Sequence, residues 1–260
     1  MIKTSLRRLV YGKPSPEAQL IARANGFPRY TPTTIQYAGF TIKVTDMLSV
    51  AWQIQEFFGE ERMKFSADGP SPVIVDCGAN VGVSILYYKS RFPASKVICF
   101  EPDAAVRACL ETNMEANGIT DVNCRPEVVW VDDRGVLFGS EGADGGSVLR
   151  TAGAAVLPSV RLKDVLREVG SIDLLKVDIE GAESEVLLDC GDELKRVKYL
   201  YVEYHSFPDR PQTLGALLEL LTTNGFRYYI HRIGVHHKHP FAGLEAADMD
   251  LQLDIHAIRG

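Results

Sequence analysis

The segment 73–82 constrains the fold of this chain more than any other feature. It reads Val-Ile-Val-Asp-Cys-Gly-Ala-Asn-Val-Gly, and its β-branched start is typical of a buried parallel strand. Gly78 and Gly82 then allow a sharp turn and a close approach of the backbone to a ligand. A helix predicted over residues 83–91 would present its free N–H groups at this turn. We therefore expect a ligand site beside a strand of a parallel sheet.

A second predicted strand ends in an acidic residue. Residues 97–102 read Val-Ile-Cys-Phe-Glu-Pro, which places Glu101 at the carboxyl end of that strand. A carboxylate there can accept hydrogen bonds from both hydroxyls of a ribose. The spacing Gly-x-x-x-Gly differs from the dinucleotide fingerprint, and no Gly-Lys-Ser/Thr follows, so a P-loop is excluded. Together the two segments predict a nucleoside site.

Strand and helix patterns alternate from residue 71 onward, which predicts an α/β fold with right-handed βαβ units and helices on both faces of the sheet. The expected strands cover residues 73–76, 97–100, 122–130, 174–177, 199–204, 227–230 and 251–258. The expected helices cover residues 83–91, 104–117, 161–169, 183–189 and 212–224. A short hairpin is predicted at residues 136–138, and the glycine-rich stretch 139–153 is expected to border the substrate site.

Residues 1–70 differ from the rest of the chain. Four early prolines precede a strand-like segment at 33–44 and a helix-like segment at 49–58, with Ser49 as the expected N-cap. We predict an N-terminal extension that caps the cofactor site, followed by one catalytic domain over residues 71–260.

Composition narrows the class of partner and the compartment. The formal net charge is −6, whereas a nucleic-acid surface needs clustered Lys and Arg, so we expect no nucleic-acid partner. The five cysteines are odd in number and lack Cys-x-x-Cys spacing, which favours a reducing cytoplasm. The sequence has no run of 18 apolar residues and no signal-peptide pattern, so we expect a cytoplasmic protein without a membrane span. The oligomeric state stays open.

Two dense polar sets follow later strands of the predicted sheet. Residues 176–183 read Lys-Val-Asp-Ile-Glu-Gly-Ala-Glu, and residues 203–205 read Glu-Tyr-His. Ligands bind outside the carboxyl ends of parallel strands, so Asp178, Glu203 and His205 are expected to surround one reacting atom. His205 is the best candidate for a general base because its ordinary pKa lies near working pH. Glu203 would orient its imidazole, and Asp178 is the competing base.

Other interpretations of these residues stay open. Glu183 suits the first turn of a helix, where a carboxylate offsets the helix dipole, and a histidine near a strand end is often a packing residue. The acids also suit Mg²⁺, which prefers oxygen ligands, so the metal content is left open. His236, His237 and His239 lack the spacing of a zinc site and are expected in an exposed loop on the substrate side.

Three of these motifs together resemble a known family. The turn Asp-x-Gly-x-Asn-x-Gly, the strand end Phe-Glu-Pro and the late motif Lys-x-Asp-x-Glu-Gly-x-Glu are similar to those of class I S-adenosylmethionine-dependent methyltransferases of the FkbM type. The resemblance covers roughly residues 57–230. It implies a seven-stranded, mostly parallel Rossmann-like sheet with one antiparallel strand near the C-terminus. It also implies S-adenosylmethionine as cofactor and O-methylation of a hydroxyl on a sugar, a glycan or a polyhydroxylated natural product.

The resemblance also implies site residues. In its light Asp178 would face the methyl donor and the acceptor, and Asp76 and Asn80 would orient the cofactor's amino acid part or the turn itself. Glu127 would meet the adenine edge, although Pro126 departs from the family pattern there. The expected cofactor-binding set is Asp76, Gly78, Asn80, Gly82, Glu101 and Glu127.

Two other functions compete with this interpretation. An NAD-dependent oxidoreductase would share the turn and Glu101, but it would need a denser glycine fingerprint and a hydride-transfer site. A non-catalytic nucleoside-binding module would share the same two features, but the acidic set around Asp178 speaks against it.

Overall fold

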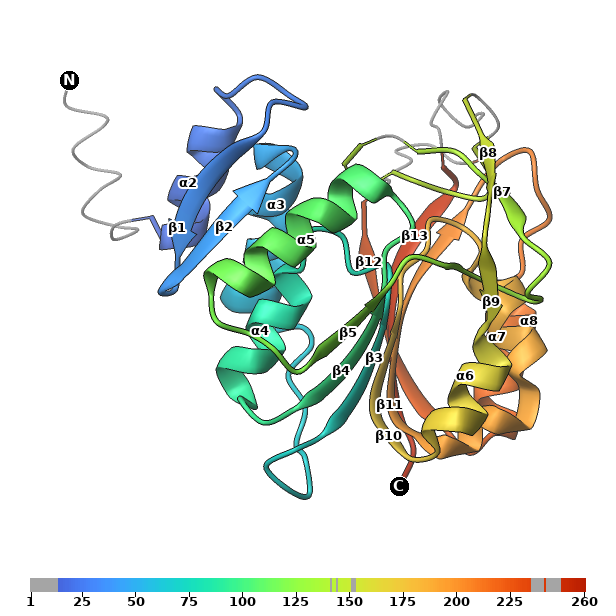
Figure 1. Ribbon diagram of the computed structural model, residues 1–260. Coiled ribbons are helices and arrows are strands. Elements are labelled where there is room, and N and C mark those ends of the chain that lie inside the picture. The colour runs from blue at the N-terminus through green and yellow to red at the C-terminus, as the bar shows by residue number, and fades with distance from the viewer. Residues whose placement is uncertain (1–13, 141, 144, 151–152, 235–240, 242–248) are drawn as a thin grey trace.

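The computed structural model describes residues 14–140, 142–143, 145–150, 153–234, 241 and 249–260. At its centre lies a seven-stranded sheet with the strand order β12-β13-β11-β10-β3-β4-β5 (Figure 1). Strand β13 is antiparallel to β11 and β12, and the pairings from β11 to β5 are all parallel. The predicted α/β fold, a mostly parallel Rossmann-like sheet with one antiparallel strand near the C-terminus, is confirmed.

Helices cover both faces of this sheet (Figure 1). The strands are β3 (Val73–Cys77), β4 (Lys96–Phe100), β5 (Val122–Arg125), β10 (Ile172–Val177), β11 (Val197–Ser206), β12 (Arg227–Ile233) and β13 (Leu251–Ile258). One face carries α4 (Val83–Arg91) and α5 (Ala104–Ala116), and the other carries α6 (Leu162–Val169), α7 (Glu183–Cys190) and α8 (Leu214–Thr223). Successive residues of a strand point to opposite faces, so Ile74 and Val75 belong to different hydrophobic clusters.

The segment predicted as one strand at 122–130 is two strands. After β5 the chain leaves the central sheet, and β6 (Val128–Trp130) pairs in parallel with β9 (Ser159–Arg161). Pro126 lies between them and has no amide hydrogen for a strand ladder. The hairpin predicted at 136–138 also differs, because β7 (Val136–Phe138) pairs with β8 (Ala155–Leu157) across the glycine-rich stretch.

The N-terminal segment forms a helix, a hairpin and a second helix. These are α2 (Pro16–Ala24), β1 (Thr33–Tyr37), β2 (Phe40–Val44) and α3 (Met47–Ile54), which runs on into the π-helical turn η1 (Gln55–Gly59). The strand-like segment 33–44 is therefore the antiparallel pair β1–β2. The N-cap of α3 is Asp46, whose carboxylate accepts the backbone N–H of Ser49 at 3.1 Å, so Ser49 lies inside the helix.

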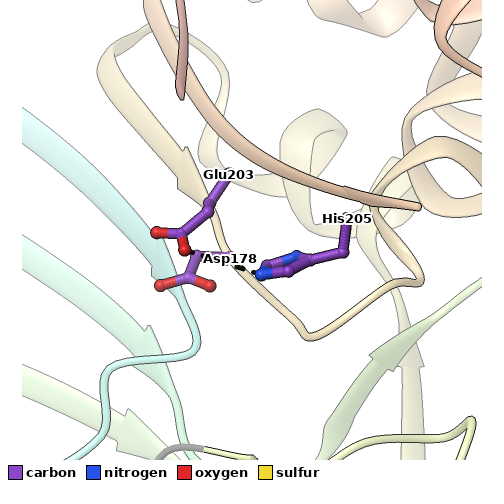
Figure 2. Close-up of side chains that lie close together, drawn as sticks. All are labelled: Asp178, Glu203 and His205. Carbon is purple, nitrogen blue, oxygen red and sulfur yellow. Dashed lines mark ion pairs between the residues drawn. The ribbon is translucent and has the colours of Figure 1, made fainter. Parts of the chain in front are cut away.

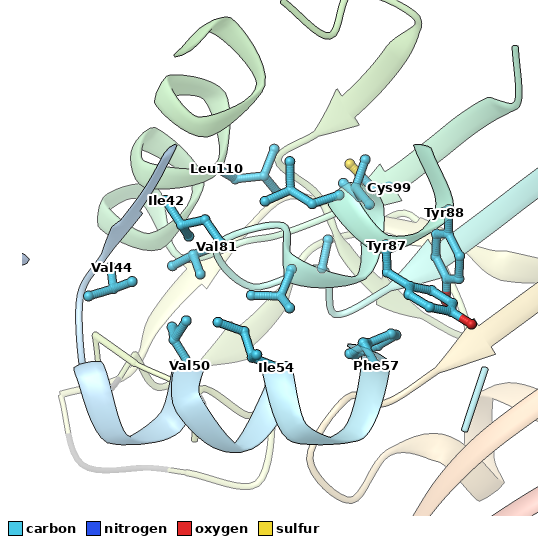
Figure 3. Packing of buried hydrophobic residues seen from close by; sticks show 14 of the residues in the cluster. Ile42, Val44, Val50, Ile54, Phe57, Val81, Tyr87, Tyr88, Cys99 and Leu110 are labelled. Carbon is cyan, nitrogen blue, oxygen red and sulfur yellow. The ribbon is translucent and has the colours of Figure 1, made fainter. Parts of the chain in front are cut away.

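The N-terminal segment shares its core with the α4–α5 face of the sheet. Val50, Ile54 and Phe57 point from α3 and η1 toward Val81 and Tyr87 (Figure 3). All five side chains are buried in one hydrophobic cluster. The segment is therefore held against the glycine turn by apolar burial, which places it beside the predicted ligand site.

Two asparagines on α5 tie the hairpin to this face. The amide side chain of Asn113 accepts the N–H of Lys43 at 2.7 Å and donates to the carbonyls of Lys43 and Val81, both at 2.8 Å. One turn later, Asn117 makes the same pair of bonds with the backbone of Thr41. Strand β2 thus satisfies its free edge with side chains of α5.

Replacing Asn113 by Ala is expected to lower the free energy of unfolding by about 1–3 kcal/mol, because buried backbone groups lose their partners. Thermal or denaturant unfolding measures the loss. Thr112→Ala is the matched control, since Thr112 is exposed and its hydroxyl donates within α5, to the carbonyl of Ala108. Equal stability of the two variants would contradict the bridging role of Asn113.

In the part of the chain that the structure describes, no helix combines the length and the apolar character that crossing a bilayer demands.

Candidate active site

The glycine turn after β3 lies against the end of β10. Gly78 has a φ of +85°, and a Cβ atom there would lie 1.9 Å from the carbonyl oxygen of Asp178. Only glycine fits this close approach between two backbones. The N–H groups of Gly78 and Ala79 donate to the carbonyl of Phe100 at 3.1 and 3.0 Å. The turn therefore joins the carboxyl ends of three adjacent strands.

Glu101 lies at the end of β4 and faces the turn. Its two carboxylate oxygens accept the backbone N–H groups of Asn80 at 2.9 Å and Asp103 at 3.0 Å. Burial raises the pKa of Glu101 to about 7, although these two hydrogen bonds oppose the shift. Each carboxylate oxygen has a second lone pair for a ligand hydroxyl. Glu101 is thus held in one orientation, with acceptor positions left free on both oxygens.

Asp76 is buried beneath the turn. Its carboxylate accepts the hydroxyl of Ser84 at 2.5 Å and lies 3.4 Å from the Nζ of Lys176. Lys176 in turn donates to the carbonyl of Gly78 at 2.9 Å and to Asp178 at 3.1 Å. Burial opposes the charge of Lys176, but Asp178 and Asp76 raise its pKa well above the usual value. This buried lysine, which the sequence analysis did not single out, connects Asp76 with Asp178 and the turn.

Asp178, Glu203 and His205 converge at the ends of β10 and β11 (Figure 2). Each offers one ligand atom, and these atoms all lie within 4.8 Å of one another. The convergence follows from the register, because β10 and β11 are parallel neighbours with Val177 opposite Val202. We call Asp178, Glu203 and His205 the acid–histidine cluster.

The imidazole of His205 is oriented by Glu183. Its Nδ1 lies 3.1 Å from a carboxylate oxygen of Glu183, which also accepts the N–H groups of Ile179 and Gly181. Glu203, the orienting acid that we expected, lies instead 3.5 Å from Nε2. Burial opposes protonation of His205, but the carboxylates, Glu183 foremost, raise its pKa well above the ordinary value. Glu183 therefore supports the imidazole as well as the start of α7.

Glu203 is held by partners from two strands. Its carboxylate accepts the side-chain amide of Gln252 at 2.6 Å and the hydroxyl of Tyr201 at 3.4 Å. The same hydroxyl of Tyr201 lies 2.5 Å from Asp254. Burial, together with the nearby charge of Asp178, raises the pKa of Glu203. Its position thus depends on the antiparallel strand β13.

One pocket connects Glu101 with Asp178 and Glu203 of this cluster. Glu101, Asn80, Asp178 and Glu203 are among its lining residues. The glycine-rich stretch also reaches it, and the side chain of Asn80 donates to the carbonyl of Ala143 at 2.8 Å. The N-terminal segment adds Gln53, Glu56 and Phe57 to the wall.

Glu56 is a pocket residue that the sequence analysis missed. It lies on the π-helical turn η1, and burial and the charge of Glu203 raise its pKa to about 8, against the opposing effect of Arg62. π-Helical turns are frequent at functional sites. Nothing in the sequence marks this turn, because its residues match an ordinary amphipathic helix.

Three residues of the expected cofactor-binding set, Asp76, Gly82 and Glu127, are not among the residues that line this pocket. The carboxylate of Glu127 is paired with Arg125 at 2.7 Å, and the pocket wall at this point is Val128 and Val129. Gly82 is the N-cap of α4 and packs near Met114.

The histidines expected on the substrate side, residues 236, 237 and 239, lie outside the described residues. Strand β12 ends at the same sheet edge as β11, because both are antiparallel to β13.

Two non-glycine residues at the site adopt left-handed backbone conformations. Asn80 has a φ of 50° and Glu180 a φ of 57°. Such conformations are uncommon outside glycine and tend to cluster at ligand sites. They follow β3 and β10, the two strands that frame the pocket.

The Rossmann-like sheet, the glycine turn and the acid at the end of β4 fit the methyltransferase class, which shares them with dinucleotide-binding oxidoreductases. Comparison with known families supports this assignment, because the model described as "Methyltransferase FkbM domain" matches residues 76–228. The chain belongs to the FkbM methyltransferase family.

Three relatives illustrate the range of the family. The AMB antimetabolite synthetase AmbE of Pseudomonas aeruginosa is 30% identical, over 77% of this chain but 11% of AmbE. The 2-O-methyltransferase NoeI of Sinorhizobium fredii is 30% identical, over 58% of this chain and 72% of NoeI. The 31-O-demethyl-FK506 methyltransferase FkbM of Streptomyces tacrolimicus is 28% identical, over 60% and 73%. The chain thus spans a small part of AmbE and most of the other two.

Proposed function

We propose that this methyltransferase transfers a methyl group from S-adenosylmethionine to a hydroxyl on a sugar, a glycan or a polyhydroxylated natural product. One observation carries the proposal: a single pocket is lined by Glu101 and by Asp178 and Glu203 of the acid–histidine cluster. A nucleoside held by Glu101 would direct its reactive group toward this cluster. Names of relatives add support, since NoeI is a 2-O-methyltransferase and the Streptomyces enzyme acts on 31-O-demethyl-FK506.

The residues divide into a donor side and an acceptor side. Glu101 would accept the ribose hydroxyls, and the turn at Gly78 and Asn80 would contact the rest of the donor. Asp178 would face both substrates. The acceptor oxygen forms a bond to the methyl carbon while the carbon–sulfur bond breaks and its electron pair stays on sulfur. The hydroxyl proton would leave at the acid–histidine cluster.

The N-terminal segment would complete the acceptor side. We propose residues 1–70 as a cap and residues 71–260 as the catalytic domain. Gln53 and Glu56 line the pocket from the cap, so an acceptor would contact both parts of the chain. Polar groups of this kind suit a hydroxylated acceptor better than an apolar one.

Two measurements test the proposed function. Calorimetry should show saturable binding of S-adenosylhomocysteine, and a screen with labelled S-adenosylmethionine over glycans, hydroxylated small molecules and peptides should find a methylated acceptor. Binding of NADH without S-adenosylhomocysteine would favour an oxidoreductase instead. Binding of S-adenosylhomocysteine without transfer to any acceptor would favour a nucleoside-binding module.

The affinity for S-adenosylhomocysteine is expected to rise with pH around neutrality. Burial holds the pKa of Glu101 at about 7, and only its ionised form accepts bonds from both ribose hydroxyls. Below that pKa each pH unit should cost up to about tenfold in affinity, and above it the curve should flatten. Calorimetric titrations between pH 5.5 and 8.5, within about 1.5 units of the pKa, measure the effect.

Glu101→Gln should raise the Kd by about 10–100-fold at pH 8 and remove this pH dependence, because a charged acceptor is lost. Glu111→Gln is the control, since Glu111 is an exposed carboxylate on α5. An unchanged pH profile in Glu101→Gln would assign the titration to another group.

A further inference from the structure

The acid–histidine cluster has the composition and dimensions of a cation site. Two carboxylates and one imidazole bring their ligand atoms within 4.8 Å of one another. Two metal–ligand bonds of roughly 2.1 Å span at most about 4.2 Å, so small side-chain rotations would let all three groups bind one ion. The Nε2 of His205 and the nearer oxygen of Glu203 are already 3.5 Å apart.

The Nε2 of His205 supplies an independent observation. The His205 side chain is 0% exposed, and among the described residues this nitrogen makes no hydrogen bond; the carboxylates of Glu203 and Glu180 lie 3.5 and 3.8 Å away, at ion-pair distance. It points toward Asp178 and Glu203 (Figure 2). A buried polar atom without a hydrogen bond is costly, so this nitrogen indicates a missing ligand.

The remaining contacts resemble the outer shell of a metal site. The Nδ1 of His205 donates its hydrogen to Glu183, the arrangement that orients metal-binding histidines. The Glu203 carboxylate is oriented by Gln252 and Tyr201, and Asp178 by Lys176. All three cluster residues are thus held by neighbours that leave ligand atoms facing one point.

We propose that Asp178, Glu203 and His205 bind one divalent first-row transition cation. The acids alone predict Mg²⁺, but the structure adds an imidazole, which favours ions such as Mn²⁺, Fe²⁺ or Zn²⁺. The cation would leave positions open for the acceptor, because the cluster offers three ligands within the described part of the chain.

The inference deepens the proposed function and rests on it for the role of the ion. A bound cation polarises a hydroxyl oxygen and lowers its pKa. With the ion bound, the three cluster residues would be ligands, so the acceptor hydroxyl would lose its proton to solvent and not to the cluster, and its oxygen would then form the bond to the methyl carbon as the carbon–sulfur bond breaks. Neighbouring acceptor hydroxyls of a diol could fill a second open position.

Binding of Mn²⁺ to the purified full chain tests the site without any methyl transfer. The protein is stripped with chelator and titrated with Mn²⁺, and free Mn²⁺ is followed by electron paramagnetic resonance. One ion per chain should bind, with Mg²⁺ competing more weakly. His205→Gln and Glu203→Gln should each weaken binding by more than the roughly 10–100-fold that loss of an outer-shell partner costs.

Glu185→Gln is the matched control, because Glu185 is an exposed carboxylate on the neighbouring α7. Its affinity for Mn²⁺ should equal that of the unchanged protein. The unchanged protein also provides a test that needs no variant, since Mn²⁺ should raise its melting temperature.

Absence of stoichiometric Mn²⁺ binding to the folded, unchanged protein would overturn the inference. Equal binding by the unchanged protein and a folded His205→Gln variant would also overturn it. Methyl transfer that continues in the presence of chelator would reject the proposed role of the ion in the reaction, while it would support the proposed function. Binding of S-adenosylhomocysteine, measured in the same samples, reports on the cofactor site separately.

Discussion

Replacing Asp178 by Asn is expected to lower the rate of methyl transfer by roughly 10²–10⁴-fold. Asp178 lines the same pocket as Glu101 and Glu203. The substitution removes the negative charge that Asp178 would need either as a base or as a ligand to a cation. The measurement is single-turnover transfer of a labelled methyl group at saturating cofactor.

The affinity for S-adenosylhomocysteine separates this effect from a loss of fold. Glu101 and the turn are unchanged in Asp178→Asn, so the Kd should stay within a few-fold of its original value. Asp164→Asn, at an exposed position on α6, is the control for surface charge. An Asp178→Asn variant that keeps full turnover would remove Asp178 from the chemistry.

Replacing Gly78 by Ala is expected to destabilise the protein severely and to abolish cofactor binding. Its φ of +85° disfavours any side chain, and the new methyl group would overlap the carbonyl oxygen of Asp178. That oxygen belongs to the backbone and cannot rotate away, so β3 and β10 would have to separate. We expect a loss of more than about 4 kcal/mol, which is exceptional for one substitution.

Gly118→Ala isolates the contribution of the close contact. Gly118 has a φ of +64°, but a Cβ atom there would meet no heavy atom within 4 Å. It should lose only the cost of the left-handed conformation, about 1–2 kcal/mol. Comparable losses of unfolding free energy in the two variants would show that the overlap at Gly78 is relieved.

The elements of the central sheet could be predicted because their signals are local. A run of β-branched residues predicts β3. For helices, a glycine just after the last residue of the apolar periodic pattern predicts where the helix ends. Helix α4 begins and ends at Val83 and Arg91, as expected. The position of Glu101 also followed from local order, since a residue just after a parallel strand lies at the ligand edge of the sheet.

Pairings across the chain could not be predicted in this way. Strand β7 pairs with β8, which lies beyond the glycine-rich stretch, and nothing in residues 136–138 specifies that partner. Pro126 explains the break between β5 and β6 and is visible in the sequence. No local feature of the sequence indicates that β6 pairs with β9. Strand pairing depends on which backbones meet in the folded core, and many partners have similar local patterns.

The amino-acid sequence alone determined the fold class, the turn, the acid at the end of β4 and the polar residues that follow β10 and β11. Only the tertiary structure decided that Glu183 orients His205, that Lys176 lies between Asp76 and Asp178, and that Glu56 reaches the pocket from the N-terminal segment. The physical reason is that these contacts depend on distances of a few ångströms between separate elements. Such distances are set by strand register and core packing, to which residues throughout the chain contribute.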